Sequence, residues 1–145
     1  MRKRIILVDD EKEFAETLAE RLRTRGYDVA TAFSGEQAIA KLKEYNYDVA
    51  IVDVLMPGVD GIEVLKEIKK IKPLTEVVML TGHGTVETAI QGMKLGAYDY
   101  LMKPCEMNTL LEKLEGACKR KEDQEERIRK ALAEKLSTSP MSALE

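Results

Sequence analysis

The sequence predicts an α/β fold: a doubly wound, five-stranded parallel sheet with five helices, the last of them extended. Five short apolar runs have the length of β-strands, and each is followed by a segment with the periodicity of an amphipathic helix. The runs are apolar at consecutive positions, so both faces of each strand are buried and a layer of helices is needed on each side of the sheet. The 145 residues, 44% of them apolar, are enough to form the core of one domain.

The predicted strands and helices alternate along the chain. The strands are the apolar runs at residues 5–8, 27–32, 49–52, 77–80 and 98–102. Each helix shows apolar residues three or four positions apart. These positions are Phe14, Leu18 and Leu22 in the first helix; Ala38, Ile39 and Leu42 in the second; Ile62, Leu65 and Ile68 in the third; Val86, Ala89, Ile90 and Met93 in the fourth; and Leu110, Leu111 and Leu114 in the fifth, which begins near Met107.

Local signals mark where the predicted helices begin and end. Ser34 with Gln37, and Asp60 with Glu63, have the spacing of a capping box at the start of the second and third helices. Thr85 can cap the fourth helix. The predicted helix ends are marked by Gly26, Pro73 and Gly96.

Few topologies are available to five parallel strands joined by right-handed crossovers, and a chain of this size favours the flavodoxin-like strand order 2-1-3-4-5. The first and third strands are then neighbours at the centre of the sheet. Ligands of open α/β sheets bind at the carboxyl ends of the strands where the winding reverses, so we expect the functional site between these two strands.

The pattern changes after residue 118. The segment KRKEDQEER, residues 119–127, contains one uncharged residue, and only Ile128, Ala131, Leu132 and Leu136 continue an apolar stripe. We therefore divide the chain into a domain at residues 1–118 and a charged helical extension with a disordered tail at residues 119–145, where Pro140 stops any helix. Dimerisation through this stripe and a solvated helix are both open interpretations.

Composition excludes several classes of function. The net charge of −3 and the lack of a long basic block argue against direct nucleic-acid binding by this chain. No apolar run approaches the length of a membrane span and the basic start is not followed by a signal-peptide core, so a cytoplasmic protein without membrane contact is expected. The chain has two cysteines and a single histidine, His83, which are too few to favour a zinc site or a Ser-His-Asp triad. We expect His83 to be an exposed loop residue.

Polar residues follow four of the predicted strands and should meet at one edge of the sheet. They are Asp9, Asp10, Asp53, Thr81 and Lys103. Three neighbouring carboxylates repel one another unless a cation lies between them, and Mg²⁺ suits a small carboxylate cluster that leaves room for water and phosphate oxygens. A fixed carboxylate beside a metal is also a competent nucleophile toward phosphorus, which favours Asp53 in that role, with Lys103 and Thr81 neutralising charge on the phosphoryl oxygens.

Each of these residues has a plainer interpretation when it is taken alone. Asp10 and Glu13 have capping-box spacing, so Asp10 can cap the first helix. Asp53 can be a turn residue, Thr81 can end a strand, and Lys103 can be a surface lysine. Their joint position at the ends of four strands favours the functional interpretation.

Four segments resemble the response-regulator receiver domains of two-component signal transduction. They are ILVDDE, DVAIVDVLMPGVDG, VVMLTGHG and YDYLMKP, which occur in the family's order and at its spacing over residues 4 to about 118. The resemblance implies that Asp53 accepts a phosphoryl group from a histidine kinase or phosphotransfer protein, and that Asp9 and Asp10 bind Mg²⁺ with Asp53. It also implies a phosphoacceptor that assists its own phosphorylation and dephosphorylation, and not a conventional enzyme.

The resemblance implies further roles at the same site. The backbone carbonyl of Leu55 matches the position that completes the metal shell, and Lys103 contacts the phosphoryl group. Thr81 and Tyr100 match the residues that move when the family switches conformation. The Lys103–Pro104 bond matches a cis peptide.

Other classes fit the residues less well. A haloacid-dehalogenase phosphatase carries a second aspartate two residues after the nucleophile, where this chain has Leu55. A flavin site needs hydroxyls and backbone amides where this chain is acidic. Three alternatives for the function remain open: a binding-only, receiver-like module, a stand-alone regulator, and the receiver of a larger transcription activator. A homodimer also remains open, either through the face formed by the fourth helix, fifth strand and fifth helix or through the C-terminal helix.

Overall fold

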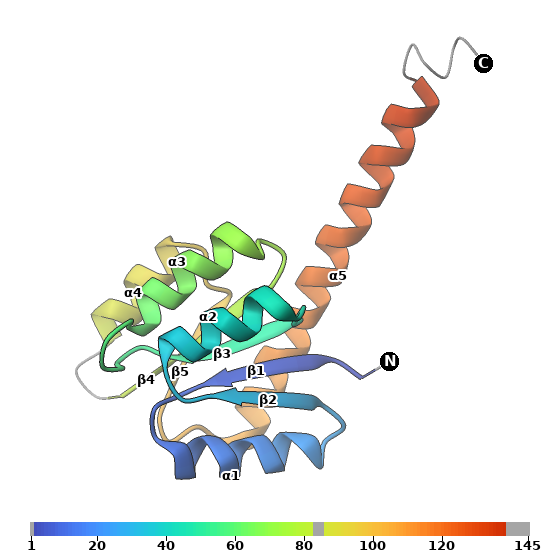
Figure 1. The fold of residues 1–145 in the computed structure, drawn as a ribbon. Coiled ribbons are helices and arrows are strands. Elements are labelled where there is room, and N and C mark those ends of the chain that lie inside the picture. The colour runs from blue at the N-terminus through green and yellow to red at the C-terminus, as the bar shows by residue number, and fades with distance from the viewer. Residues whose placement is uncertain (1, 83–85, 139–145) are drawn as a thin grey trace.

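A computed structural model describes residues 2–82 and 86–138, and these residues form a three-layered α/β domain from which one helix projects (Figure 1). The strands are β1 (Arg4–Val8), β2 (Asp28–Ala32), β3 (Val49–Asp53), β4 (Glu76–Thr81) and β5 (Asp99–Met102). The helices are α1 (Lys12–Arg23), α2 (Gly35–Glu44), α3 (Gly61–Ile71), α4 (Val86–Lys94) and α5 (Met107–Thr138). The predicted helix cap Thr85 and histidine His83 lie outside the described residues, as does the predicted tail after residue 138.

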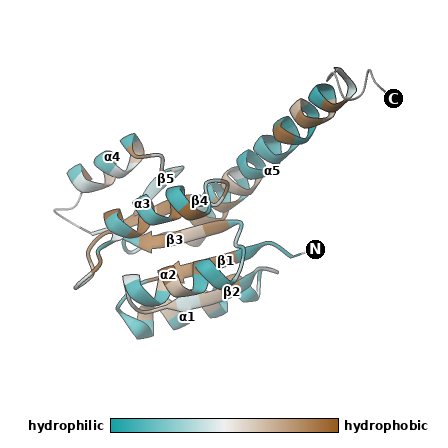
Figure 2. Cartoon of the chain, turned by 45° about the horizontal axis from the view of Figure 1, so that its top comes forward, coloured by the Kyte–Doolittle hydropathy of each residue, from teal (hydrophilic) through white to brown (hydrophobic). Residues whose placement is uncertain are grey.

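All five strands are parallel, in the order β2-β1-β3-β4-β5, which confirms the predicted doubly wound, flavodoxin-like topology. Successive side chains of a strand point to opposite faces of the sheet. Ile6 and Val8 of β1 accordingly enter the core beneath α2 and α3, whereas Ile5 and Leu7 enter the core beneath α1 and α5. This two-sided burial explains the continuous apolar runs, and Figure 2 shows much of β3 in the brown of hydrophobic residues.

The helix boundaries follow the predicted signals closely. The Ser34 side chain accepts a hydrogen bond from the Gln37 backbone N–H, and the Asp60 side chain accepts one from Glu63, so both capping predictions are confirmed. After α1 the chain turns at Gly26, whose φ of +93° is a left-handed conformation that favours glycine. The strand bounds differ from the predicted runs by one residue at some ends. Flanking polar residues such as Arg4 and Asp53 continue the ladder beyond the apolar run, whereas β2 and β5 begin one residue later than predicted, after Tyr27 and Tyr98.

The outer edge of β2 is covered by basic side chains. The Ala32 carbonyl accepts a hydrogen bond from Asp9 N on the β1 side, so the carbonyls of Val29 and Thr31, at alternate positions, face outward. Arg23 Nη2 donates to Val29 O at 2.9 Å, and Lys41 Nζ donates to Thr31 O. Both outward carbonyls therefore already have donors.

The fifth helix is much longer than the other four. Its first turns lie against the sheet and its later turns project from the domain (Figure 1). Leu110, Leu114, Ala117 and Cys118 are buried, and from Lys119 onward most side chains are exposed. The predicted fifth helix, its start at Met107 and its extension past the domain agree with this element. Within the described residues, no helix combines the length and the apolar character needed to cross a membrane.

Candidate functional site

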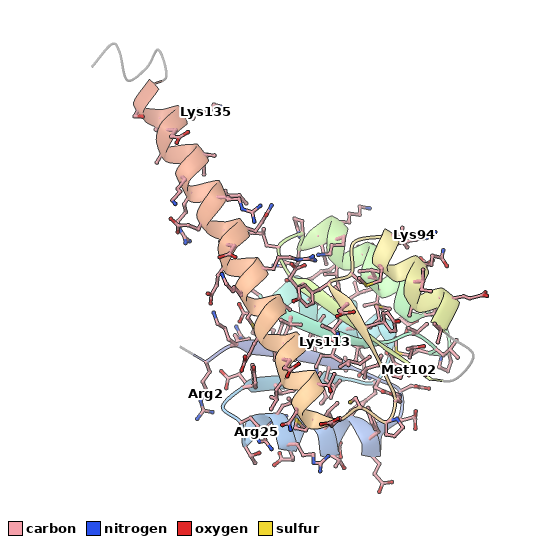
Figure 3. The ribbon with its side chains drawn as sticks, turned by 180° about the vertical axis from the view of Figure 1, so that it is seen from behind. Arg2, Arg25, Lys94, Met102, Lys113 and Lys135 are labelled. Carbon is pink, nitrogen blue, oxygen red and sulfur yellow. The ribbon has the colours of Figure 1, made fainter. Side chains whose placement is uncertain are left out.

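The predicted polar residues gather at the carboxyl ends of the strands. Asp9 directly follows β1, Asp53 is the last residue of β3 and Thr81 is the last residue of β4. Lys103 follows β5, next to Met102, which Figure 3 labels. Because the strands are parallel and adjacent, their ends bring residues 94 positions apart in the sequence into one site.

Three aspartates form an acidic cluster in this site. Asp9, Asp10 and Asp53 each offer a carboxylate oxygen, and these oxygens lie within 4.8 Å of one another. Asp9 is fully buried and Asp53 is 6% exposed, whereas Asp10 faces solvent. Burial, and then repulsion from Asp9, raises the pKa of Asp53 from 3.8 to about 6, and Lys103 offsets only part of that rise.

The acidic cluster fits a divalent cation. Asp9 Oδ1 accepts a hydrogen bond from Glu11 N at 2.9 Å. Asp9 Oδ2 is enclosed, lies 2.6 Å from Lys103 Nζ, and receives no well-aligned hydrogen bond from the residues that the structure describes. A buried carboxylate oxygen beside two further carboxylates is the oxygen-rich environment that Mg²⁺ prefers.

Lys103 is held above the cluster by several groups. Its Nζ lies 2.6 Å from Asp9 Oδ2, 3.0 Å from Glu11 Oε1 and 3.4 Å from Asp53 Oδ2. The same ammonium lies 4.6 Å from the centre of the Phe14 ring, within cation–π range. Burial lowers the pKa of Lys103, but the carboxylates, Asp9 and Glu11 first, outweigh burial and raise it, so the ammonium stays charged.

The other predicted residues surround this centre. Thr81 is buried, and its hydroxyl donates to the Gly82 carbonyl at 3.2 Å. The Leu55 backbone N–H donates to Asp53 Oδ1 at 3.4 Å, while the Leu55 side chain is 63% exposed. Tyr100 is half-buried and packs against the core on the α3 side of the sheet. The Lys103–Pro104 peptide bond is cis, as the resemblance implied.

Sequence reasoning missed Glu11 and Phe14. Glu11 is the N-cap residue of α1, but its side chain does not cap the helix and instead reaches Lys103. The capping interpretation of Asp10 is therefore wrong, since the cap position belongs to the next residue. The acidic run Asp9-Asp10-Glu11 was the available signal for a fourth acid at the site, but the contact with Lys103 joins residues 92 positions apart.

The family comparison agrees with this geometry. The sequence model of the response regulator receiver domain matches residues 5–115, more than half of the chain. The chain belongs to the response regulator receiver domain family. Receiver domains are signalling phosphoacceptors, and the fold and the acidic cluster described above are those expected of the family.

Two curated relatives are named as regulators. The receiver domain is 42% identical over 113 residues to the transcriptional regulatory protein ZraR of Salmonella typhimurium, covering 78% of this chain and 26% of that protein. It is 37% identical over 116 residues to a putative NtrX-like response regulator of Rickettsia felis, covering 79% of this chain and 24% of the relative. The chain thus spans about a quarter of the length of these curated relatives.

Solved structures show the same fold. A receiver domain protein from Clostridium thermocellum superposes with a TM-score of 0.80 at 37% identity, covering 83% of this chain and 97% of that one. NtrX from Brucella abortus, in complex with ADP, superposes with a TM-score of 0.82 at 34% identity, covering 87% of this chain and 29% of that one.

Proposed function

We propose that this receiver domain is a phosphorylation switch in which Asp53 accepts a phosphoryl group from a histidine kinase or a phosphotransfer protein in a Mg²⁺-dependent reaction. One observation carries the proposal: the buried carboxylate of Asp53 lies in the cluster with Asp9 and Asp10, with Lys103 Nζ 3.4 Å away. A nucleophilic carboxylate, an acidic cation site and a mobile positive charge are the groups that phosphoryl transfer needs.

Asp9, Asp10 and Asp53, together with the backbone carbonyl of Leu55, are the groups that would hold the metal. A bound Mg²⁺ neutralises charge on the carboxylates and on the phosphoryl oxygens. The bond changes involve groups of the protein itself. An Asp53 oxygen forms the new bond to phosphorus while the bond from phosphorus to the donor's nitrogen breaks, and the Leu55 N–H steadies the carboxylate through Asp53 Oδ1.

Phosphorylation adds nearly two negative charges at Asp53, and the neighbouring groups rearrange around them. Lys103, which shares its ammonium among three carboxylates, redistributes its contacts toward the phosphoryl group. Thr81 supplies a hydroxyl from the end of β4, and Tyr100 on β5 turns inward as Thr81 moves. The active conformer is favoured only by such differences in contact between the two states.

The altered surface then binds a partner or a second copy of the chain. Exposed apolar side chains on α4 and β5, including Ile90, Met93 and Met102, support a contact on the face formed by α4, β5 and α5. The stripe of Ile128, Leu132 and Leu136 on α5 is a second candidate for dimerisation. Sedimentation with and without a phosphoryl mimic tests both candidates, because a monomer in both states at high concentration rules out both dimers.

The wider role is proposed from the relatives. Since ZraR is named as a transcriptional regulatory protein and this chain matches a quarter of it, we infer that the chain is the receiver of a cytoplasmic transcription regulator. We also propose that the same site residues assist both gain and loss of the phosphoryl group. A stand-alone regulator that acts through protein contacts is the alternative.

Intact mass after incubation with acetyl phosphate tests the chemistry. The expected result is a gain of one phosphoryl group that requires Mg²⁺, is absent in Asp53→Ala, and is retained in Asp28→Ala, an exposed aspartate at the other end of the sheet. If no gain occurs, a beryllium fluoride titration decides: saturable binding indicates rapid hydrolysis of the aspartyl phosphate, and no binding indicates a binding-only module and refutes the proposal.

A further inference from the structure

Where the long helix α5 leaves the domain, three consecutive residues each form an ion pair at the beginning of a different strand. Arg120 pairs with Glu76, the first residue of β4. Lys121 Nζ lies 3.2 Å from Asp48, the residue before β3. Glu122 pairs with Lys3, the residue before β1. Since β1, β3 and β4 are neighbours in the sheet, these contacts fan out across its amino-terminal edge.

Glu76 is the most buried residue in these three contacts. Glu76 is 6% exposed and accepts hydrogen bonds from Arg120 at both carboxylate oxygens, with Nη2 to Oε1 at 2.9 Å. Lys69 Nζ lies 3.2 Å from the same Oε1. A forked arginine–carboxylate pair fixes orientation as well as charge, and loss of one partner leaves a buried charge underpaired.

The contact between Lys121 and Asp48 is anchored to the backbone. Asp48 Oδ2 accepts a hydrogen bond from Arg4 N at 2.8 Å, so the Asp48 side chain is fixed to the start of β1 before Lys121 reaches it. The three helix residues do not carry the same charge, since residues 120 and 121 are basic and residue 122 is acidic. Rotation of α5 about its axis would bring like charges together in place of the observed pairs.

The start of β5 is tied to the same part of α5. A Cβ atom at Gly116 would lie 2.1 Å from the Tyr98 hydroxyl, so the tyrosine occupies space that only glycine leaves open. One turn further along, Arg120 stacks over the Tyr98 ring at 4.8 Å. Asp99 pairs with Lys113, which Figure 3 labels on the inner part of α5. Residues 113, 116 and 120 share one face of the helix.

We propose that residues 120–122, with Glu76, Asp48 and Lys3, form a clamp that holds residues 119–138 of α5 as a rigid arm in a fixed direction, and that Tyr98 makes β5 part of this clamp. A displacement of β5 then changes the direction of the arm. Because β5 also carries Tyr100, the arm is mechanically connected to the strand that bears the proposed switch residue. The clamp itself does not depend on phosphorylation of Asp53.

The test measures the distance between two spin labels by pulsed electron paramagnetic resonance. One label is placed on α1 by Glu16→Cys and the other on the arm by Lys130→Cys, both at exposed positions, in a background in which Cys105→Ser and Cys118→Ala prevent other labelling. Retained helical circular dichroism and a cooperative unfolding transition establish that each variant is folded. The expected result for the otherwise unchanged chain is one narrow distance distribution.

Variants of the clamp give the decisive comparison. Arg120→Ala and Glu122→Lys should each broaden the distribution, and adding Lys3→Glu to Glu122→Lys should restore it because the charge pair is re-formed. Lys119→Ala is the matched control and should leave the distribution narrow, since among the residues that the structure describes Lys119 forms an ion pair only with Asp123, one turn along the same helix.

The contribution of β5 is tested separately. Gly116→Ala leaves every ion pair in place but displaces Tyr98, so the mean distance should shift. An unchanged distribution in both Arg120→Ala and Glu122→Lys, or failure of the double charge reversal to restore it, overturns the clamp. An unchanged mean in Gly116→Ala overturns its connection to β5.

Discussion

Replacing Asp53 by asparagine should stabilise the metal-free protein. The Asp53 carboxylate is buried beside Asp9, and its pKa rises from 3.8 to about 6 in the folded state. At pH 7 that rise destabilises the folded state by about 3 kcal/mol relative to a neutral side chain of the same shape. Asparagine resembles the protonated acid, so Asp53→Asn should recover up to this amount, or roughly 10 °C in Tm.

The pH dependence gives this prediction a definite sign. Between pH 3.8 and about 6 the folded protein binds a proton at Asp53 that the unfolded chain has released, so stability falls as pH rises through this window. The stability advantage of Asp53→Asn should therefore be largest above pH 6 and vanish near pH 4. Adding Mg²⁺ should narrow the advantage at pH 7, because the cation stabilises the wild-type carboxylate and finds a weaker ligand in the variant.

Urea denaturation in EDTA at several pH values measures these differences. Asp28→Asn is the control, because Asp28 is exposed and should change stability by less than about 0.5 kcal/mol. If the wild type is as stable as Asp53→Asn at pH 7 without metal, the acidic cluster is not under electrostatic strain. Repulsion among its carboxylates would then not indicate a cation at this site.

Three further predictions concern single contacts. Asp60→Ala should lower stability by about 1 kcal/mol in urea denaturation through loss of the α3 cap, whereas Asp60→Asn, which still caps, should not. Glu11→Gln should raise the affinity for beryllium fluoride in the presence of Mg²⁺ by up to about fivefold, because it frees Lys103 from a competing carboxylate. The control Glu13→Gln, inside α1, should not raise it. Equal effects of the two variants would refute the idea that Glu11 competes for Lys103. Gly61→Ala should cost about 1 to 3 kcal/mol in the same urea assay, since its Cβ would lie 2.2 Å from the carbonyl of the proposed phosphoacceptor; a neutral result would contradict the close approach.

The sequence was sufficient to predict the sheet and the polar residues that follow its strands at one edge. A continuous apolar run indicates a parallel strand that is buried on both faces, and the rules for connections between strands predict the strand order. Once the order is known, Asp9, Asp53 and Thr81 must meet, because each ends or follows a strand in the same direction. These features depend on patterns within short segments, which a single sequence displays.

Contacts that depend on side-chain direction were not predictable in the same way. Glu11 follows the strand end like its acidic neighbours, but its contact with Lys103 depends on how the backbone enters α1. The pairs of Arg120 and Glu122 depend on the rotation of α5 relative to the sheet, which no local pattern specifies. The sequence showed a charged helix there, and the partners of those charges only appear in three dimensions.

The covered edge of β2 restricts how copies of this domain can associate. Two open sheets can join edge to edge about a twofold axis, with β2 antiparallel to its own copy, only if outward carbonyls are free to accept new donors. Arg23 and Lys41 occupy the carbonyls of Val29 and Thr31, and a joined sheet would have to displace both charged side chains. A continuous sheet through β2 is thereby disfavoured, and assemblies of this receiver are directed to its helical faces and to the β5 side.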